Sequence, residues 1–345
     1  FQLLKFYPLL PNPRLVHAAA HPLMILLGLA CVAIAAVAQE DLYGDTCRNA
    51  ACGASMLQVR SSTESRYVIA ASAEEEIVNM ALLQDAAYKG TDVAGWVQLA
   101  GFEAVQVYSH EGVCVLAFHG TDEAADWADN VMVVGDVKDV CGSNIHRGFW
   151  REASKILGNP AWEENVVPVL IGSDCTSIYA IGHSMGGAVA SILAACANHG
   201  QLSAIHPNAT TSLSISKLYT YAAPAASSTG FINPLSSNGC WEGARYFIVD
   251  DWYFDPVPPA LFPFGFAHPH VQPIQLGMHD GILQSTLWSC DSVEAEVQPR
   301  DLTSNVSLGR FGFISVPKLP SIATHDRVQY MDRIMALAES TVVKL

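Results

Sequence analysis

Short apolar runs alternate with longer segments of helical character along most of the chain. Strands are predicted where β-branched and aromatic residues cluster, at residues 104–108, 113–118, 177–181, 218–222 and 245–249. Helices are predicted where apolar positions share one face or alanine is abundant, at residues 74–89, 187–198 and 326–338. One more helix follows residues 145–149 and ends near Gly158, because Asn159-Pro160 cannot continue it. This alternation predicts an α/β fold, with a central, mostly parallel sheet flanked by helices.

The strand at residues 177–181 passes into its helix through a sharp glycine-rich turn. The turn reads Gly182-His183-Ser184-Met185-Gly186. Small residues at positions 182 and 186 let the strand and the helix crowd together, with Ser184 at a strained apex. This geometry exposes the serine hydroxyl beside the Met185 N–H at a helix N-terminus. The pattern predicts a serine nucleophile, whereas the pentapeptide alone also fits a chance glycine-rich turn.

A serine nucleophile needs two partners further along the chain. A histidine must take the hydroxyl proton, and a carboxylate must hold that histidine in one tautomer. Where the serine occupies such a turn, the chain order is Ser, then the acid, then His. His325 lies just before the last predicted helix and is the predicted base. The loop at residues 250–263 supplies Asp255 as the predicted acid, with Asp251 as the alternative.

The other histidines after the turn have different interpretations. His199 lies at the far end of the turn's own helix, and His206 is predicted in a surface loop. His268 and His270 stand near aspartates, but their spacing gives no full set of metal ligands. We therefore expect no metal and no cofactor.

These motifs together resemble the class 3 lipase family, the fungal-type triacylglycerol lipases of the α/β-hydrolase superfamily. Five segments carry the resemblance in the family's order: Phe118-His119-Gly120-Thr121 with Asp126-Trp127-Ala128-Asp129, His146-Arg147-Gly148-Phe149, Gly182 to Ala188, Asp255-Pro256-Val257-Pro258, and His325 with Tyr330. The resemblance implies an α/β-hydrolase fold in which Ser184 is the nucleophile, Asp255 the acid and His325 the base. It also implies that Thr121 supplies an oxyanion-hole donor beside the Met185 N–H.

The chain departs from the family pattern at one turn. After the strand at residues 218–222 the family usually has a glycine-proline-arginine turn, but this chain reads Ala222-Ala223-Pro224-Ala225-Ala226. The change affects a loop near the predicted acid.

Residues 123–134 form a predicted amphipathic helix. Trp127 lies on the apolar face, and Asp126 lies on the polar face. Two interpretations stay open: a mobile lid that covers the site in water, or an ordinary surface helix.

Composition and charge limit the class of protein. The chain has 345 residues, of which 50% are hydrophobic and 15% are charged, so it is long enough and apolar enough for a large core. The net charge of −15 argues against a nucleic-acid partner. No internal repeat or long linker follows residue 39, so we expect a single domain at residues 39–345.

The N-terminal segment has the pattern of a secretory signal. An apolar run covers residues 23–38 and ends in Ala36-Val37-Ala38, an A-x-A cleavage pattern. The run is short for a membrane span, so we expect cleavage and no stable membrane span afterwards. Either Met24 starts this signal, or Lys5 and Arg14 belong to a longer charged region before it.

Cysteines and sequons agree with export. Eight cysteines follow the signal, and an even number in an exported chain predicts disulfides. Eight cysteines allow 105 connectivities, among which Cys47 with Cys52 and Cys240 with Cys290 are candidate pairs. Cys114 and Cys196 fit disulfides or buried thiols equally well. Asn208 and Asn305 begin glycosylation sequons.

The sequence thus predicts a secreted serine carboxylic-ester hydrolase that forms an acyl-enzyme, with triacylglycerol lipase as the first reading and an acylglycerol at a lipid–water interface as its substrate. A feruloyl esterase or a phospholipase would use the same residues. A lipid-binding protein without turnover is the alternative from another class, and the complete set of candidate residues argues against it.

Overall fold

The computed structural model describes residues 71–120, 135–206, 212–251, 253–279, 282–287, 289–290, 303–307, 313–317, 319–320 and 325–342. Several sequence predictions lie outside these residues: the signal at residues 1–38, Thr121, the segment at residues 123–134 with Asp126 and Trp127, Cys47, Cys52 and Asn208.

A central eight-stranded sheet has the strand order β1-β2-β3-β6-β7-β8-β10-β11. Its parallel part consists of β3 (Val113–Phe118), β6 (Ser177–His183), β7 (Lys217–Tyr221), β8 (Trp241–Ile248) and β10 (Val271–His279). Antiparallel strands extend both edges: β1 (Val97–Phe102) and β2 (Val105–His110) on one side, and β11 (Ile282–Leu287) on the other. The predicted mostly parallel sheet is confirmed.

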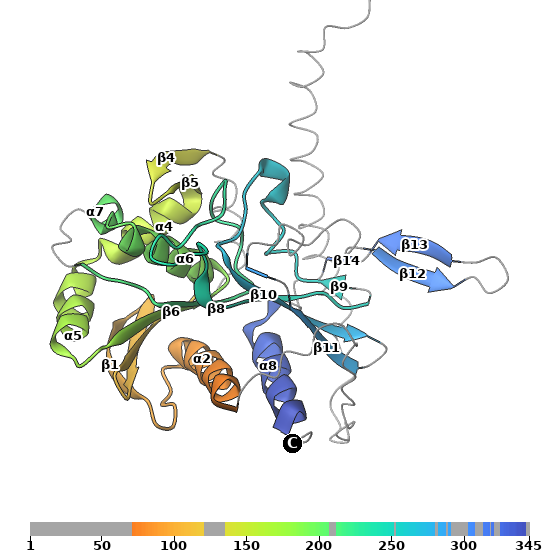
Figure 1. Ribbon diagram of the computed structural model, residues 1–345, viewed down its shortest axis with the longest axis horizontal. Helices are drawn as coiled ribbons and strands as arrows, with labels where there is room; N and C mark the ends of the chain where they lie inside the picture. Colours follow the sequence, from red (N-terminus) through yellow and green to blue (C-terminus); the bar gives the residue numbers. More distant parts are fainter. Residues whose placement is uncertain are drawn as a thin grey trace, which may run out of the picture. The chain divides into compact units, whose positions relative to one another are not determined.

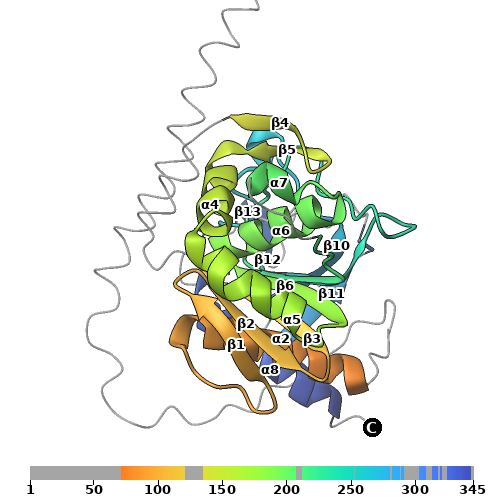
Figure 2. The same cartoon turned by 90° about the vertical axis from the view of Figure 1, so that its left-hand side faces the viewer.

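Helices cover both faces of this sheet (Figures 1 and 2). On one face lie α4 (Arg147–Leu157), α5 (Val167–Gly172) and α6 (Met185–Asn198), and on the other lie α2 (Ala71–Lys89) and α8 (Arg327–Val342). Each face has its own hydrophobic core, because side chains of a strand alternate between the two faces. The result is the three-layer arrangement of an α/β protein.

Helix α6 fills the centre of its layer. All of its residues are buried, and many are alanine or glycine. A helix that is apolar on every side belongs in a protein interior. Its small side chains let the helix axis come close to β6 and β7, which brings the start of α6 to the end of β6.

Shorter elements connect the layers. They are β4 (Asp136–Val140), β5 (Ser143–His146), the π-helix η1 (Trp162–Val166), α7 (Leu202–Ile205), β9 (Tyr253–Phe254), the 3-10 helix η2 (Phe262–Phe264), β12 (Thr303–Ser307), β13 (Phe313–Pro317) and β14 (Leu319–Pro320). Strand β9 pairs with β14, and β12 pairs with β13.

Strand β10 was not predicted from the sequence. It carries Gln272, Pro273, Gln275 and Gly277, which interrupt the apolar pattern of a buried strand. Proline is rare inside a sheet because it cannot donate a ladder hydrogen bond, and here the register shifts between Val271 and Pro273. Tertiary contact with β8 and β11 outweighs this weak local preference.

Three disulfides are present among the described residues. Cys114–Cys175 joins β3 to the segment before β6, and Cys141–Cys196 joins the β4–β5 turn to α6. Cys114 and Cys196 are therefore disulfide-bonded and are not free buried thiols. The predicted pair Cys240–Cys290 is confirmed, with a Cα–Cα distance of 6.1 Å.

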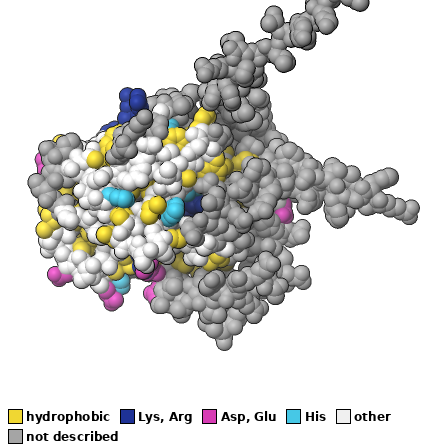
Figure 3. Space-filling view, turned by 45° about the horizontal axis from the view of Figure 1, so that its top comes forward, with side chains coloured by type: hydrophobic (Ala, Val, Ile, Leu, Met, Phe, Trp, Pro, Cys, Tyr) yellow, Lys and Arg dark blue, Asp and Glu magenta, His cyan; other side chains and the backbone are white. Residues whose placement is uncertain are grey.

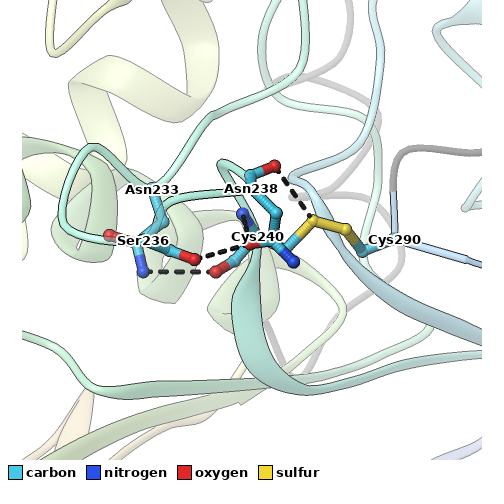
Figure 4. The surroundings of a disulfide bond; sticks show 5 residues. All are labelled: Asn233, Ser236, Asn238, Cys240 and Cys290. Carbon is cyan, nitrogen blue, oxygen red and sulfur yellow. Dashed lines mark hydrogen bonds between the residues drawn. A yellow bond between two sulfur atoms is a disulfide. The ribbon is translucent and has the colours of Figure 1, made fainter.

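The turn before Cys240 is ordered by Asn238 (Figure 4). The side-chain oxygen of Asn238 accepts hydrogen bonds from the Ser236 hydroxyl at 2.5 Å and from the Cys240 N–H at 3.1 Å. The Cys240–Cys290 bond thus joins an already structured turn at the start of β8.

His206 is not in a surface loop, contrary to the sequence interpretation. Only 3% of it is exposed, and its Nε2 contacts a Glu163 carboxylate oxygen. Its sequence neighbours Pro207 and Asn208 suggested exposure, but packing between α7 and η1 buries the ring. A local pattern could not reveal this tertiary contact.

Exposed hydrophobic side chains are distributed over the described surface. In Figure 3 they stand among polar side chains and do not merge into one patch on the face shown. No helix among the described residues is both long enough and apolar enough to span a bilayer.

Candidate active site

Ser184 lies in a strained turn between β6 and α6. Its φ of 55° and ψ of −127° are unusual for a residue with a side chain. The Ser184 N–H donates to the Tyr221 carbonyl of the neighbouring strand at 2.9 Å, which holds the turn to the sheet. The structure thus has the strand–turn–helix geometry that the sequence predicted around Ser184.

Two glycines make this turn sterically possible. A Cβ on Gly182 would lie 2.3 Å from the Gly186 carbonyl carbon, and a Cβ on Gly186 would lie 2.2 Å from the Phe118 carbonyl oxygen. Both distances are shorter than backbone atoms allow, so the close approach of β6, α6 and β3 requires glycine at both positions.

His325 contacts the serine hydroxyl. Its Nε2 lies 2.9 Å from Ser184 Oγ, although the two residues are 141 positions apart in sequence. His325 stands just before α8, and its ring approaches the site from the same edge of the sheet at which β6 ends. The other ring nitrogen, Nδ1, lies 3.1 Å from each carboxylate oxygen of Asp255.

The Asp255 carboxylate is held from three sides. Besides His325, it accepts the Val257 N–H at 2.9 Å and the Tyr330 hydroxyl at 2.6 Å. Burial raises the pKa of Tyr330 well above its ordinary value, and the Asp255 charge adds to this effect. Tyr330 therefore stays protonated and remains a hydrogen-bond donor to Asp255.

Asp255 reaches this place because the chain reverses directly after β8. The Asp250 N–H donates to the Tyr253 carbonyl at 2.7 Å, and the Asp255 N–H donates to the Ile248 carbonyl at 3.0 Å. Strand β9 then pairs in parallel with β14, which ends five residues before His325. The acid loop and the base segment are thus joined by main-chain pairing.

The neighbouring aspartates have other contacts. The Asp250 carboxylate accepts two hydrogen bonds from Arg333 of α8, at 2.6 and 2.9 Å, and one from the Met278 N–H at 2.7 Å. The Asp251 N–H donates to the Met278 carbonyl at 3.2 Å. The carboxylate that His325 Nδ1 contacts belongs to Asp255, the first choice from the sequence.

Met185 is the first residue of α6. The first N–H groups of a helix have no acceptor within the helix, and the helix dipole makes this end electropositive. A negative oxygen beside Ser184 would therefore meet favourable main-chain donors. The second predicted donor, Thr121, lies outside the described residues, directly after Gly120.

The departure from the family turn produces close packing. Ala222 has a φ of 53°, and its N–H donates to the Tyr246 carbonyl at 3.0 Å. A Cβ on Gly187 would lie 2.6 Å from the Ala223 Cβ. Small side chains at 222 and 223 thus leave room for the turn at Ser184.

His183 and Tyr88, two residues behind Ser184, contact each other, and no sequence motif predicts a role for this pair. His183 precedes Ser184 and is buried, and burial lowers its pKa well below the ordinary value, with the charge of His325 as the next cause. Its ring contacts Tyr88 of α2. His183 lay within the quoted motif, but the chain offers no local signal that links it to Tyr88, 95 positions earlier.

The described residues contain no group of three His, Cys, Asp or Glu side chains arranged to hold a metal ion. His268 is instead packed edge-on against the Phe262 ring, with ring centroids 5.3 Å apart. Burial lowers the His268 pKa well below its ordinary value, and the charge of Arg245 lowers it further.

A serine at a strand-to-helix elbow, followed in the chain by an acid and a histidine, on a mostly parallel sheet with helices on both faces, defines the α/β-hydrolase fold. Residues 115–259 match the family model described as Lipase (class 3), a range that includes Ser184 and Asp255. This match bears out the resemblance to the class 3 lipase family that the sequence motifs predicted, and it supports a lipase-type carboxylic-ester hydrolase.

Two solved fungal lipases are similar to this chain. The Rhizomucor miehei lipase, in its propeptide complex, is 17% identical with a TM-score of 0.46, and the match covers 70% of this chain and 84% of that one. The lipase from Rhizopus microsporus var. chinensis is 17% identical with a TM-score of 0.46, covering 78% and 94%. Among curated proteins, no sequence matches this chain. The family assignment rests on the family match and not on these two likenesses.

Proposed function

We propose that this protein is a secreted triacylglycerol lipase that works through an acyl-enzyme on Ser184. The observation that carries the proposal is the unbroken hydrogen-bonded series Ser184 Oγ, His325 and Asp255, with distances of 2.9 and 3.1 Å. This series supports the proposal that Ser184 is the nucleophile, His325 the base and Asp255 the orienting acid.

In the first half of the reaction, Ser184 Oγ attacks the ester carbonyl carbon while His325 Nε2 takes the hydroxyl proton. The carbonyl oxygen becomes an oxyanion, which the Met185 N–H and Thr121 stabilise. One such donor typically contributes about 3 kcal/mol to lowering the barrier. The carbon–oxygen bond to the alcohol then breaks, and His325 gives its proton to the leaving alkoxide.

In the second half, water attacks the acyl-enzyme and His325 Nε2 takes its proton. The second tetrahedral intermediate collapses, the bond to Ser184 Oγ breaks, and the proton returns to the serine. Asp255 keeps the His325 proton on Nδ1, so that Nε2 is free to act as base. Tyr330 and the Val257 N–H fix the carboxylate for this task.

A lipid substrate is supported by exposed aromatic side chains on either side of Asp255 in the sequence. Tyr253 is 47% exposed and Phe264 is 40% exposed. Aromatic side chains at a protein surface suit contact with a lipid–water boundary. Residues 123–134, with Asp126 and Trp127, are the candidate lid of the proposed enzyme, with an ordinary surface helix as the alternative.

Secretion is supported by the disulfides. The three disulfides join residues that lie in or next to the sheet and α6. Such bonds are typical of proteins that fold in an oxidising compartment. We assign the apolar segment at residues 23–38 to the signal and Asn208 and Asn305 to glycosylation sites within the same proposal.

Hydrolysis of a substrate panel tests the function. Wild type and Ser184→Ala would be assayed with emulsified triolein, p-nitrophenyl butyrate, methyl ferulate and phosphatidylcholine micelles. We expect wild type to prefer triolein and Ser184→Ala to lose at least 1,000-fold in kcat on every ester, in keeping with the loss of a nucleophile (about 10⁶-fold in other hydrolases). Preference for ferulate or phospholipid would overturn the substrate assignment, and activity that survives the mutation would overturn the nucleophile.

A further inference from the structure

A partly buried hydrogen-bonded bridge reaches the main chain of His325, and its two side chains, Tyr88 and His183, do not belong to the proposed triad. We propose that Tyr88 and His183 are positioning residues that hold the base, His325, at a fixed place relative to the loop entering Thr121. The inference rests on the function proposed above and adds two residues to it.

The bridge consists of three contacts. The Gly120 N–H donates to Tyr88 Oη at 2.5 Å. Tyr88 Oη lies 3.0 Å from His183 Nδ1, and His183 Nε2 lies 3.0 Å from the His325 carbonyl oxygen. The series runs without interruption from the end of β3 to the main chain of the base.

Elementary donor rules fix the direction of every contact. A carbonyl only accepts, so His183 Nε2 carries the proton. The neutral ring then has an accepting Nδ1, which requires Tyr88 to donate its hydroxyl proton there. Tyr88 Oη keeps a lone pair for the Gly120 N–H, so each donor in the bridge meets one acceptor.

The surroundings keep His183 neutral, as this arrangement requires. The ring is buried, and the groups that face it are His325, Arg327, Tyr330 and Tyr88. Burial and the charge of His325 both lower its pKa. A second proton would turn Nδ1 into a donor, and Nδ1 could then no longer accept the hydrogen bond from the Tyr88 hydroxyl.

The bridge connects the parts of the site that must keep their relative positions. Gly120 directly precedes Thr121, His183 directly precedes Ser184, and the His325 carbonyl belongs to the base itself. One partly buried hydrogen-bonded series thus joins Gly120, His183 and His325, of which the first two are the sequence neighbours of Thr121 and Ser184. A misplacement of about 1 Å at such groups can cost about 100-fold in rate.

Helix α2 supports the bridge from behind. Gln84, one turn before Tyr88, donates to the Phe118 carbonyl at 3.1 Å. Arg327 pairs with Asp85 at 3.4 Å and lies over the Tyr88 ring, with its guanidinium carbon 4.6 Å from the ring centroid. One helix therefore contacts both the exit of β3 and the segment that carries His325.

The first test is Tyr88→Phe, assayed with p-nitrophenyl butyrate. The change removes the hydroxyl and keeps the ring under Arg327. We expect kcat to fall about 10- to 100-fold while KM changes less than about 2-fold, because the positioning of reacting groups is lost and not substrate binding. The matched control is Tyr219→Phe. Tyr219 lies on β7, and its buried hydroxyl contacts Glu76 of α2, the helix that also carries Tyr88. This contact lies away from the site, so its loss should leave kcat unchanged.

The second test separates positioning from folding by conservative rescue. His183→Gln keeps an amide donor that can reach the His325 carbonyl, whereas His183→Ala has none. We expect His183→Gln to retain at least 10-fold more kcat than His183→Ala when both are compared at temperatures equally far below their Tm. Equal kcat in the two variants would contradict the bridge.

The outcomes distinguish this inference from the function on which it rests. If wild type hydrolyses the ester, Ser184→Ala is inactive and Tyr88→Phe equals wild type in kcat, the bridge has no positioning role and the triad stands. If Ser184→Ala is as active as wild type, the proposed function itself is wrong. If Tyr219→Phe lowers kcat as much as Tyr88→Phe does, the effect comes from the packing of α2 in general. That result would overturn the positioning role of the bridge.

Discussion

The Asp255 carboxylate is buried completely, and a buried charge is costly unless it is paired and hydrogen-bonded. Here an imidazole, a phenol and a main-chain N–H all point at it. Their combined contacts leave the carboxylate in one orientation, so the imidazole ring of His325 also has one orientation. At the scale of single residues, the site is thus organised from the acid outward to the serine.

His268 gives a pH-dependent stability that can be measured outside the site. Its pKa is lowered in the folded protein, while the unfolded chain titrates near about 6.5. Stability is therefore present above pH 6.5 and is lost as the pH falls below it, because the unfolded state gains the proton first. Between pH 7.5 and 5.5 this loss is on the order of 1 kcal/mol of unfolding free energy.

Urea unfolding of wild type and His268→Gln at both pH values measures this contribution. Glutamine has no titration in this range, so the decrease in unfolding free energy from pH 7.5 to 5.5 should be smaller in the variant, by on the order of 1 kcal/mol. An equal decrease in both proteins would show that His268 does not stay neutral in the fold.

The sequence offers candidates for individual roles only where the chemistry dictates an order along the chain. Ser184, Asp255 and His325 follow one another as elbow hydrolases require, so they could be chosen before any contact was known. Tyr88 and His183 could not be linked, since their contact depends on packing of α2 against the end of β6. Tyr330 was part of a motif, but its hydrogen bond to Asp255 needs the turn of α8.

At the scale of elements, the site depends on β9 and β14. These short strands pair Tyr253 with Leu319 and Phe254 with Pro320, and so bring the acid loop beside the base segment. Neither strand has a sequence pattern of its own, because two residues cannot show a periodicity. The β6–α6 unit was predictable, since its strand, turn and helix each carry local signals.

The predicted lid at residues 123–134 can be tested by substrate concentration. If this helix covers the site in water and turns outward at a lipid surface, activity should rise sharply when an ester passes its solubility limit. Trp127→Ala, which removes the largest side chain of the apolar face, should reduce that rise. Tributyrin hydrolysis on both sides of the limit measures it, and smooth saturation through the limit in wild type would favour the ordinary surface helix.

At the scale of the whole molecule, the site lies where several parallel strands end. Ser184 follows β6, the acid loop follows β8, and Gly120 follows β3. In α/β proteins the carboxyl ends of parallel strands form the usual place for a site. The sheet and both helical layers were predictable from alternation, whereas the edge strands β1 and β11 and the inner strand β10 were not, because tertiary pairing decides them.

The central claim is that Ser184 is the nucleophile of an ester hydrolase. Incubation with diethyl p-nitrophenyl phosphate, followed by peptide mass spectrometry, tests it most directly. The account predicts one diethylphosphoryl group per chain, located on Ser184, release of one equivalent of nitrophenol, and loss of activity in proportion to labelling. Labelling of another residue with activity lost, or full activity with Ser184 labelled, would contradict it.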